Sequence, residues 1–133
     1  MENSTPNQFS QLNDVLDRLI NTLLPKATRN KSFFVNDIPD HLQLKKESSV
    51  LTSVLGSLLS TVVSNAWESC IWLSAKLYGN VIMVHVKNSG IIGTRAIEAQ
   101  LHVLQAIAQK NKGTIGFTSH QANITSLTFS FYS

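Results

Sequence analysis

The residue types that could carry chemistry are few and far apart in this sequence. The single cysteine, Cys70, excludes an internal disulfide and a metal site built on cysteines, and we expect it to be a small buried apolar residue. The histidines fall on separate predicted elements, and no two have metal-ligand spacing on one element: His41, His85, His102 and His120. There is no phosphate-binding GxxxxGK(S/T) loop, no GxGxxG after a strand and no nucleophile elbow. We therefore expect no catalytic residue of these classes.

One group of polar residues differs from the rest, because each member lies where a predicted element ends. Asn65 lies near the C-terminal end of a helix, and Asn88 and Gly90 follow a hairpin strand. The amide oxygen of an asparagine is a suitable hard ligand for Mg²⁺. An asparagine near a helix C-terminus is also an ordinary capping residue. Both interpretations of Asn65 stay open from the sequence.

Two helical patterns must position these residues. Apolar residues at spacings of three and four predict an amphipathic helix over 8–24, which Pro25 is expected to end. This helix either packs on its own domain or pairs with a second copy in a homodimer. A second helix, 48–66, has a continuous apolar stripe, and its other side holds only small uncharged residues. Either another element packs closely on that side, or the side lines a cavity that holds polar atoms.

The rest of the chain alternates between strand and helix patterns. In chain order we predict a strand at 32–35, a hairpin of 71–77 and 81–87, a loop at 91–95, a helix at 96–110 and a second hairpin of 114–119 and 124–132. This mixed order predicts an α+β fold. The expected architecture is a two-layer sandwich whose mixed, mostly antiparallel sheet is covered on one face by helices.

Composition bounds the class of the protein and its location. The 133 residues predict one globular domain, with 1–25 as a polar tail and helix and 26–133 as the main body. Only 14% of the residues are charged, against about a quarter in a typical domain, which suggests a surface covered by a partner or a ligand. The basic residues are scattered despite a net charge of +3, so we expect no nucleic-acid partner. No segment reads as a membrane span or a signal peptide, and a lone cysteine favours a cytoplasmic location.

The order of these segments resembles the ATP-binding domain of sensor histidine kinases, within the GHKL superfamily that includes DNA gyrase and the heat-shock chaperone ATPases. The resemblance runs from about Lys31 to Tyr132 and rests on segments such as VVSNA, VKNSG, LHVLQAIAQKNKGTI and LTFSF. It implies the two-layer fold, a role in bacterial two-component signalling and Mg-ATP as the cofactor. The helix at 8–24 contains no phosphoacceptor histidine, so any phosphotransfer would need an acceptor on another protein.

The resemblance also implies the site residues. In the family, an asparagine of the N-box holds the Mg²⁺ that bridges the nucleotide phosphates. Asn65 matches this asparagine, and Glu68 stands where gyrase-like members carry an acid. The aspartate of the Asp-x-Gly-x-Gly box accepts a hydrogen bond from the adenine amino group, and Asn88 replaces it here. Gly90 matches the first glycine of that box, whereas Ile92 replaces the second.

The third box of the family, Gly-x-Gly-Leu before the last helix, cradles the phosphates with backbone N–H groups. Its counterpart is 98–101, Glu-Ala-Gln-Leu, which keeps Leu101 and lacks both glycines. The loop from Ile91 to the helix is also short for the flexible lid that the family closes over ATP. We therefore expect a histidine-kinase-like signalling module with weakened or lost nucleotide binding that acts through protein–protein interaction. The alternative is a stand-alone ATP/Mg-binding kinase component, similar to anti-sigma-factor kinases, that phosphorylates a partner.

Overall fold

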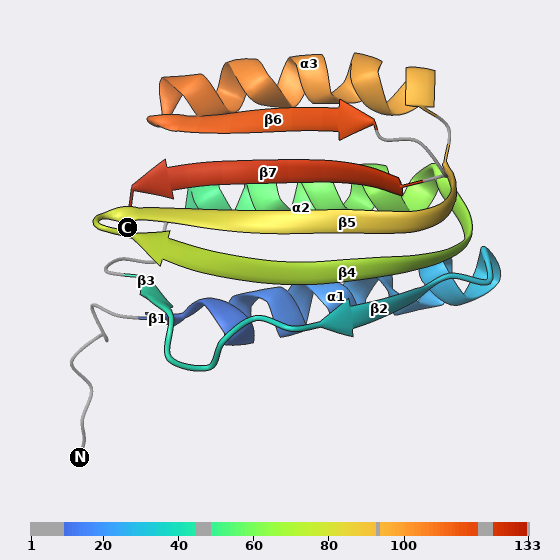
Figure 1. Cartoon of the computed structure of the whole chain (residues 1–133), viewed down its shortest axis with the longest axis horizontal. Helices are drawn as coiled ribbons and strands as arrows, with labels where there is room; N and C mark the ends of the chain where they lie inside the picture. The colour runs from blue at the N-terminus through green and yellow to red at the C-terminus, as the bar shows by residue number, and fades with distance from the viewer. Residues whose placement is uncertain (1–9, 45–48, 93, 120–123, 133) are drawn as a thin grey trace.

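The computed structural model of the chain describes residues 10–44, 49–92, 94–119 and 124–132 (Figure 1). Its elements, in chain order, are β1 (Ser10–Gln11), α1 (Leu12–Arg29), β2 (Phe33–Asn36), β3 (Gln43–Leu44), α2 (Ser49–Ser64), β4 (Ala66–Tyr78), β5 (Val81–Ile92), α3 (Thr94–Lys110), β6 (Gly113–Ser119) and β7 (Ile124–Tyr132). The predicted order of helices and hairpins is confirmed. The short antiparallel pair of β1 and β3 is an addition that the sequence pattern did not predict.

The main sheet has five strands in the order β2-β4-β5-β7-β6. β2 runs parallel to β4, and every other neighbouring pair in this sheet is antiparallel. The long hairpin of β4 and β5 turns at Gly79 and Asn80 and forms the centre of the sheet (Figure 1). The prediction of a mixed, mostly antiparallel sheet is confirmed.

The hydrophobic core lies between one face of this sheet and the helices α1, α2 and α3, which lie behind the sheet in Figure 1. Strand β4 shows the division of the two faces. Ile71, Leu73 and Ala75 are buried, whereas Trp72 between them is exposed. Such alternation is typical of a sheet with one covered face and one open face. The two-layer α+β sandwich is therefore confirmed.

Helix α1 belongs to this core and differs from the predicted helix at both ends, since it begins only at Leu12, after the strand residues Ser10 and Gln11. Four buried side chains of α1, Leu12, Val15, Leu16 and Ile20, join the core cluster. The helix continues through Pro25 to Arg29, so the prediction that Pro25 ends it is wrong. Proline removes one backbone donor, but the next turn is anchored by other contacts: Ala27 is fully buried, and its carbonyl accepts the N–H of Ser32 at 2.8 Å.

Strands β4 and β5 are longer than predicted at the end near the candidate residues. β4 begins at Ala66, directly after Asn65, and β5 continues to Ile92. The predicted loop at 91–95 is therefore wrong, because Ile91 and Ile92 pair with Trp67 and Ala66. The ladder is interrupted by a bulge between Trp67 and Cys70. A bulge interrupts the alternation of buried and exposed residues. For this reason the sequence pattern did not predict the first residues of β4.

Among the residues that the structure describes, no helix combines the length and the apolar composition that crossing a membrane requires. The expected absence of a helical membrane span is met within those ranges. Helix α2, the most apolar of the three, packs instead in the middle of the helix layer, between α1 and α3.

Candidate functional site

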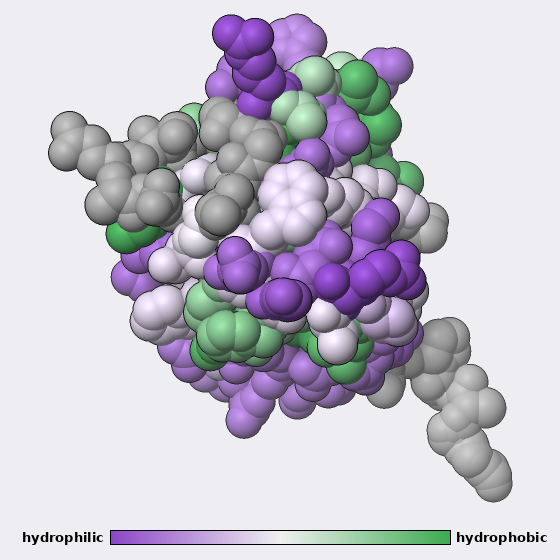
Figure 2. Space-filling model, turned by 90° about the vertical axis from the view of Figure 1, so that its right-hand side faces the viewer, coloured by the Kyte–Doolittle hydropathy of each residue, from purple (hydrophilic) through white to green (hydrophobic). Residues whose placement is uncertain are grey.

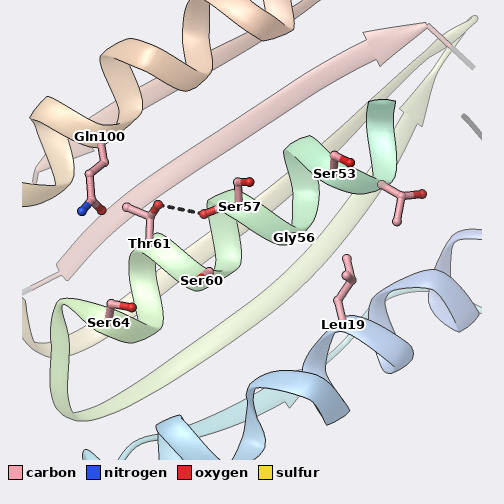
Figure 3. Close-up of a pocket in the computed structure, with 9 residues that line it drawn as sticks. Leu19, Ser53, Gly56, Ser57, Ser60, Thr61, Ser64 and Gln100 are labelled. Carbon is pink, nitrogen blue, oxygen red and sulfur yellow. Dashed lines mark hydrogen bonds between the residues drawn. The ribbon is translucent and has the colours of Figure 1, made fainter. Parts of the chain in front are cut away.

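The small uncharged side of α2 forms the floor of a groove between α1 and α3 (Figure 3). The groove has a volume of about 630 Å³ and is lined by Leu19, Thr52, Ser53, Gly56, Ser57, Ser60, Thr61, Ser64 and Gln100. Of the two alternatives for this side of the helix, a cavity that holds polar atoms is the one that the structure shows. The small residues also allow a close approach, since a Cβ at Gly56 would lie 3.3 Å from Leu19 Cδ2.

Asn65 lies at one end of this groove, directly after the last residue of α2. Its side-chain amide donates to the carbonyl of Thr61 at 2.8 Å and to Gln100 Oε1 at 3.3 Å. The first contact is the capping interaction that the sequence left open. The second contact joins the end of α2 to α3. Both contacts use the amide nitrogen, so the amide oxygen is the atom that could face a cation.

Asn88 lies on the helix-covered face of β5 and is almost completely buried, with 1% of its surface exposed. Its amide nitrogen lies 3.5 Å from Ser69 Oγ, and its Oδ1 has no hydrogen-bond partner among the described residues. A buried carbonyl oxygen without a donor costs about 1–3 kcal/mol. Asn88 therefore offers an acceptor that a bound N–H group, such as the amino group of adenine, could satisfy.

Gly90 and Glu68 meet where β5 passes the bulge of β4. Gly90 has φ of +135°, and a Cβ built on it would lie 2.5 Å from Ser69 Oγ and 2.8 Å from the carbonyl oxygen of Glu68. Glu68 itself has φ of 51°, and its N–H donates to the carbonyl of Asn30 at 2.9 Å. The Glu68 side chain is exposed. The sheet thus requires glycine at position 90 for its own geometry, independently of any ligand.

The remaining candidate, Leu101, belongs to the core, with 5% of its surface exposed. Residues 98–101 lie inside α3, which begins at Thr94. The N–H groups of these residues therefore bond within the helix, and only the first turn of α3 keeps N–H groups without helical partners. The predicted helix at 96–110 already contained this segment, and the helix in the structure begins two residues earlier. The segment therefore does not precede the last helix, as the third box of the family does.

Four of the five candidates therefore gather at one end of the molecule, where α2 ends, β4 begins and β5 ends: Asn65, Glu68, Asn88 and Gly90. Figure 2 faces this end and shows hydrophilic side chains in its middle, with hydrophobic side chains in separate patches around them. The side chain of Ile92, which replaces the second glycine of the family's box, lies outside the described residues, so its effect on the site stays a prediction.

Sequence reasoning did not identify Ser69 and Gln100. Ser69 is buried, contacts Asn88 and donates to the carbonyl of Trp67 at 2.9 Å. Gln100 contacts Asn65 across the groove. The signal for Gln100 was present, since it replaces the second glycine of the third box. Nothing in the local pattern distinguishes Ser69 from the other serines, because its role arises from the bulge.

The residues at this end fit the two halves of Mg-ATP unequally. The free acceptor on Asn88 suits an adenine, and the Asn65 oxygen is a suitable single ligand for Mg²⁺. Within the described ranges, no three His, Cys, Asp or Glu side chains come together as a metal site. For the triphosphate half, residues 98–101 lie inside α3, so their N–H groups bond within the helix and are not available to cradle phosphates. The described residues therefore offer contacts to an adenine and to Mg²⁺, and no backbone cradle at 98–101.

At the level of sequence, no protein-family model and no curated protein matches the chain. Solved structures do match it. The nucleotide-free catalytic domain of the histidine kinase ThkA superposes with a TM-score of 0.77 at 16% identity, covering 99% of this chain and 96% of that one. The Acinetobacter baumannii histidine kinase AdeS gives a TM-score of 0.76 at 14% identity, covering 96% of this chain and 68% of that one.

The chain has the fold of a histidine kinase catalytic domain. ThkA crystallised in complex with the response regulator TrrA also matches, with a TM-score of 0.73 at 16% identity, covering 93% of this chain and 41% of the kinase. The resemblance inferred from the sequence is thus confirmed for the fold. These identities are too low to carry over the residues of the site.

Proposed function

We propose that this chain is a histidine-kinase-like signalling module of the cytoplasm, with weakened or lost nucleotide binding, that acts by contact with a signalling protein. The observation that carries the proposal is the junction of β5 and α3. A single residue joins them, which leaves no chain for a lid and draws the counterpart of the phosphate cradle into the helix.

The size of the loss follows from the contacts that the triphosphate would need. Backbone N–H groups that cradle phosphates bind an anion strongly only when they lack other partners. Each such contact removed costs about 1–3 kcal/mol. Two or three losses of that size move a micromolar dissociation constant to the millimolar range or beyond.

A protein partner is supported by the surface of the helix layer. The groove over α2 is uncharged and lined by hydroxyl groups. Next to it, a hollow of about 180 Å³ has apolar walls that include Val50, Val54, Leu104 and Ile107. The chain carries few charges, and low charge is typical of the centre of an interface. ThkA, which has the same fold, was crystallised with a response regulator, and we extend this class of partner to the present chain.

A second candidate function is favoured by one specific observation. The buried Oδ1 of Asn88 has no donor among the described residues, and an adenine amino group would supply one. In this alternative the chain is a stand-alone ATP/Mg-binding kinase component, with Asn65 at the Mg²⁺ and Asn88 at the adenine. It would phosphorylate a residue of a partner.

Isothermal titration of the full chain with Mg-ATP separates the two candidates. We expect no affinity tighter than millimolar. Micromolar affinity that Asn65→Ala abolishes would overturn the proposal and favour the kinase component. Asn111→Ala is the matched control, because the Asn111 amide donates to the carbonyl of Ile107 at 2.9 Å, the same contact that Asn65 makes with Thr61, at the other end of the molecule.

A further inference from the structure

The open face of the sheet, which faces the viewer in Figure 1, holds a hollow that the proposed function does not use. It has a volume of about 360 Å³ and is lined by Trp72, Ser74, Lys76, His85, Val86, Lys87 and Ser126. These residues come from β4, β5 and β7. All of them except Val86, which belongs to the core, lie on the face opposite the helices. The volume lies within the range of small-molecule sites.

The strand register brings these side chains together. Trp72 lies opposite Lys87, which lies opposite Ser126 on the next strand. Residues that are direct partners across strands point to the same face. In the adjacent row of the same face, Ser74 lies opposite His85. His85 Nδ1 and Thr128 Oγ1 share a hydrogen bond of 3.1 Å, whose direction depends on the tautomer of the imidazole. The indole ring of Trp72, the basic side chains of Lys76, His85 and Lys87, and several hydroxyl groups therefore share one surface.

The charge of this hollow is uncompensated. Lys76 and Lys87 are exposed, and among the described residues that line the hollow there is no carboxylate. His85 lies between them, and its pKa is lowered by burial first and then by the positive charges of Lys76 and Lys87. Two lysines held beside a neutral imidazole favour an anion, which would reduce the repulsion between them.

The hollow also has a flat apolar wall. Trp72 exposes 45% of its surface, and Lys87 Nζ lies 6.0 Å from the centroid of its ring. An exposed aromatic ring beside basic side chains on an open sheet is the combination that stacks a base and holds its phosphate. An acidic peptide would use the lysines but would leave the ring without a partner.

We propose that this hollow binds a nucleotide unit, either free or within a single-stranded nucleic acid, with the base stacked on Trp72 and the phosphate between Lys76 and Lys87. The basic residues are scattered along the sequence, and the antiparallel pairing of β4 with β5 is what gathers them. The site lies on the other face of the sheet from Asn65 and Asn88, so it does not depend on the ancestral nucleotide cleft.

The test uses the full chain carrying Trp67→Phe, which leaves Trp72 as the one tryptophan, in buffer with a chelator and no Mg²⁺. Emission of Trp72 is followed on addition of AMP, an eight-residue oligodeoxyadenylate, inorganic phosphate and a polyglutamate peptide. We expect AMP or the oligonucleotide to quench the emission. If AMP quenches the emission and the oligonucleotide does not, at equal concentration of nucleotide units, the ligand is a free nucleotide. If the oligonucleotide binds at least tenfold tighter than AMP, the ligand is a single-stranded nucleic acid.

Anisotropy of a labelled oligonucleotide, and AMP competition against it, then measure the variants. Lys76→Gln and Lys87→Gln are each expected to weaken binding about fivefold, and Trp72→Leu about tenfold. Lys110→Gln, which removes an exposed lysine from α3, is the matched control and is expected to change nothing. The proposal is overturned if neither nucleotide form binds at millimolar concentration, if Lys110→Gln weakens binding as much as Lys87→Gln, or if polyglutamate or phosphate binds as tightly as the nucleotides.

Discussion

At the scale of single residues, two glycines of this sheet have opposite roles. Gly90 has a positive φ, and a Cβ there would lie within 2.8 Å of three atoms of the β4 bulge. A Cβ added at Gly116 on β6 would meet no atom within 4 Å, and Gly116 has no positive φ. We expect Gly90→Ala to lower the free energy of unfolding by about 3 kcal/mol, measured by urea denaturation. Gly116→Ala is the control and is expected to be neutral, and equal effects would contradict this account.

The buried Oδ1 of Asn88 leads to a prediction of increased stability, in contrast to the loss expected for Gly90→Ala. Replacing Asn88 by leucine removes an amide oxygen that has no donor among the described residues. Its amide nitrogen makes only a long contact of 3.5 Å with Ser69, whose hydroxyl keeps its bond to Trp67. We expect Asn88→Leu to raise the free energy of unfolding by about 1 kcal/mol. A loss of stability in the ligand-free chain would show that the amide is satisfied after all.

His85 gives the chain a pH dependence in one direction. Its pKa is lowered from 6.5 by burial and by the charges of Lys76 and Lys87. The strand neighbours that face it, Ser74 and Thr128, carry no charge. The unfolded chain therefore binds this proton at a higher pH than the folded chain, so stability falls as the pH drops below 6.5.

The measurement is the urea midpoint at pH 7.5 and pH 5. The fall between these two values is expected to be smaller in His85→Gln than in the parent chain. Carboxylates titrate in both proteins alike, so the difference between the two falls isolates the imidazole. An equal fall in both proteins would contradict the lowered pKa.

At the scale of elements, the spacing of apolar residues predicted every helix and every strand of the main sheet. It failed at three places, where a bulge, a very short strand pair or a buried residue after a proline determined the structure. The bulge at Trp67–Cys70 broke the alternation of β4, so pairing of Ala66 with Ile92 could not be read from the pattern. The pair of β1 and β3 is too short to give a period, with two residues in each strand. Helix α1 continues beyond Pro25 because the following turn is held in the core by the buried Ala27.

The continuation of α1 beyond Pro25 predicts that this proline weakens the helix. Pro25 is exposed and cannot donate to the carbonyl one turn earlier. We expect Pro25→Ala to raise the free energy of unfolding by about 1–2 kcal/mol, since part of the gain is offset by a more flexible unfolded chain. Leu24→Ala, which truncates a side chain 41% exposed, is the neighbouring control and is expected to change stability little. A destabilised Pro25→Ala variant would contradict the continuous helix.

At the scale of the whole molecule, the sequence predicted the fold better than the site. The resemblance assigned Asn65, Asn88 and Gly90 to one site, and the structure places them at one end of the sandwich, where the elements that carry them meet. It could not predict the direct junction of β5 with α3, because this depends on Ile91 and Ile92 extending the ladder. The hollow at Trp72 and Lys87 depends on which residues lie opposite one another in neighbouring strands. This register cannot be predicted from the sequence of one strand alone.

The role of α1 decides whether the molecule folds as a single copy. The sequence allowed its apolar side to serve either its own core or a homodimer, and the structure buries Leu12, Val15, Leu16 and Ile20 within one chain. These side chains of the apolar side of α1 are therefore already covered within the chain. We expect light scattering to give the monomer mass of 14.7 kDa. The urea midpoint is also expected to be independent of protein concentration, since only an association that accompanies folding would make it vary.

Leu16→Ala extends this prediction to the packing itself. Leu16 is completely buried, so truncation leaves a cavity and is expected to cost about 2–5 kcal/mol, with the same loss at low and high protein concentration. In a homodimer held by this helix, the loss would instead grow as the protein is diluted. Thr22→Ala serves as the control on the exposed side of the same helix, because its hydroxyl donates to the carbonyl of Arg18 one turn earlier in the same helix. A dimer mass that Leu16→Ala converts to a folded monomer would show that α1 pairs with a second copy.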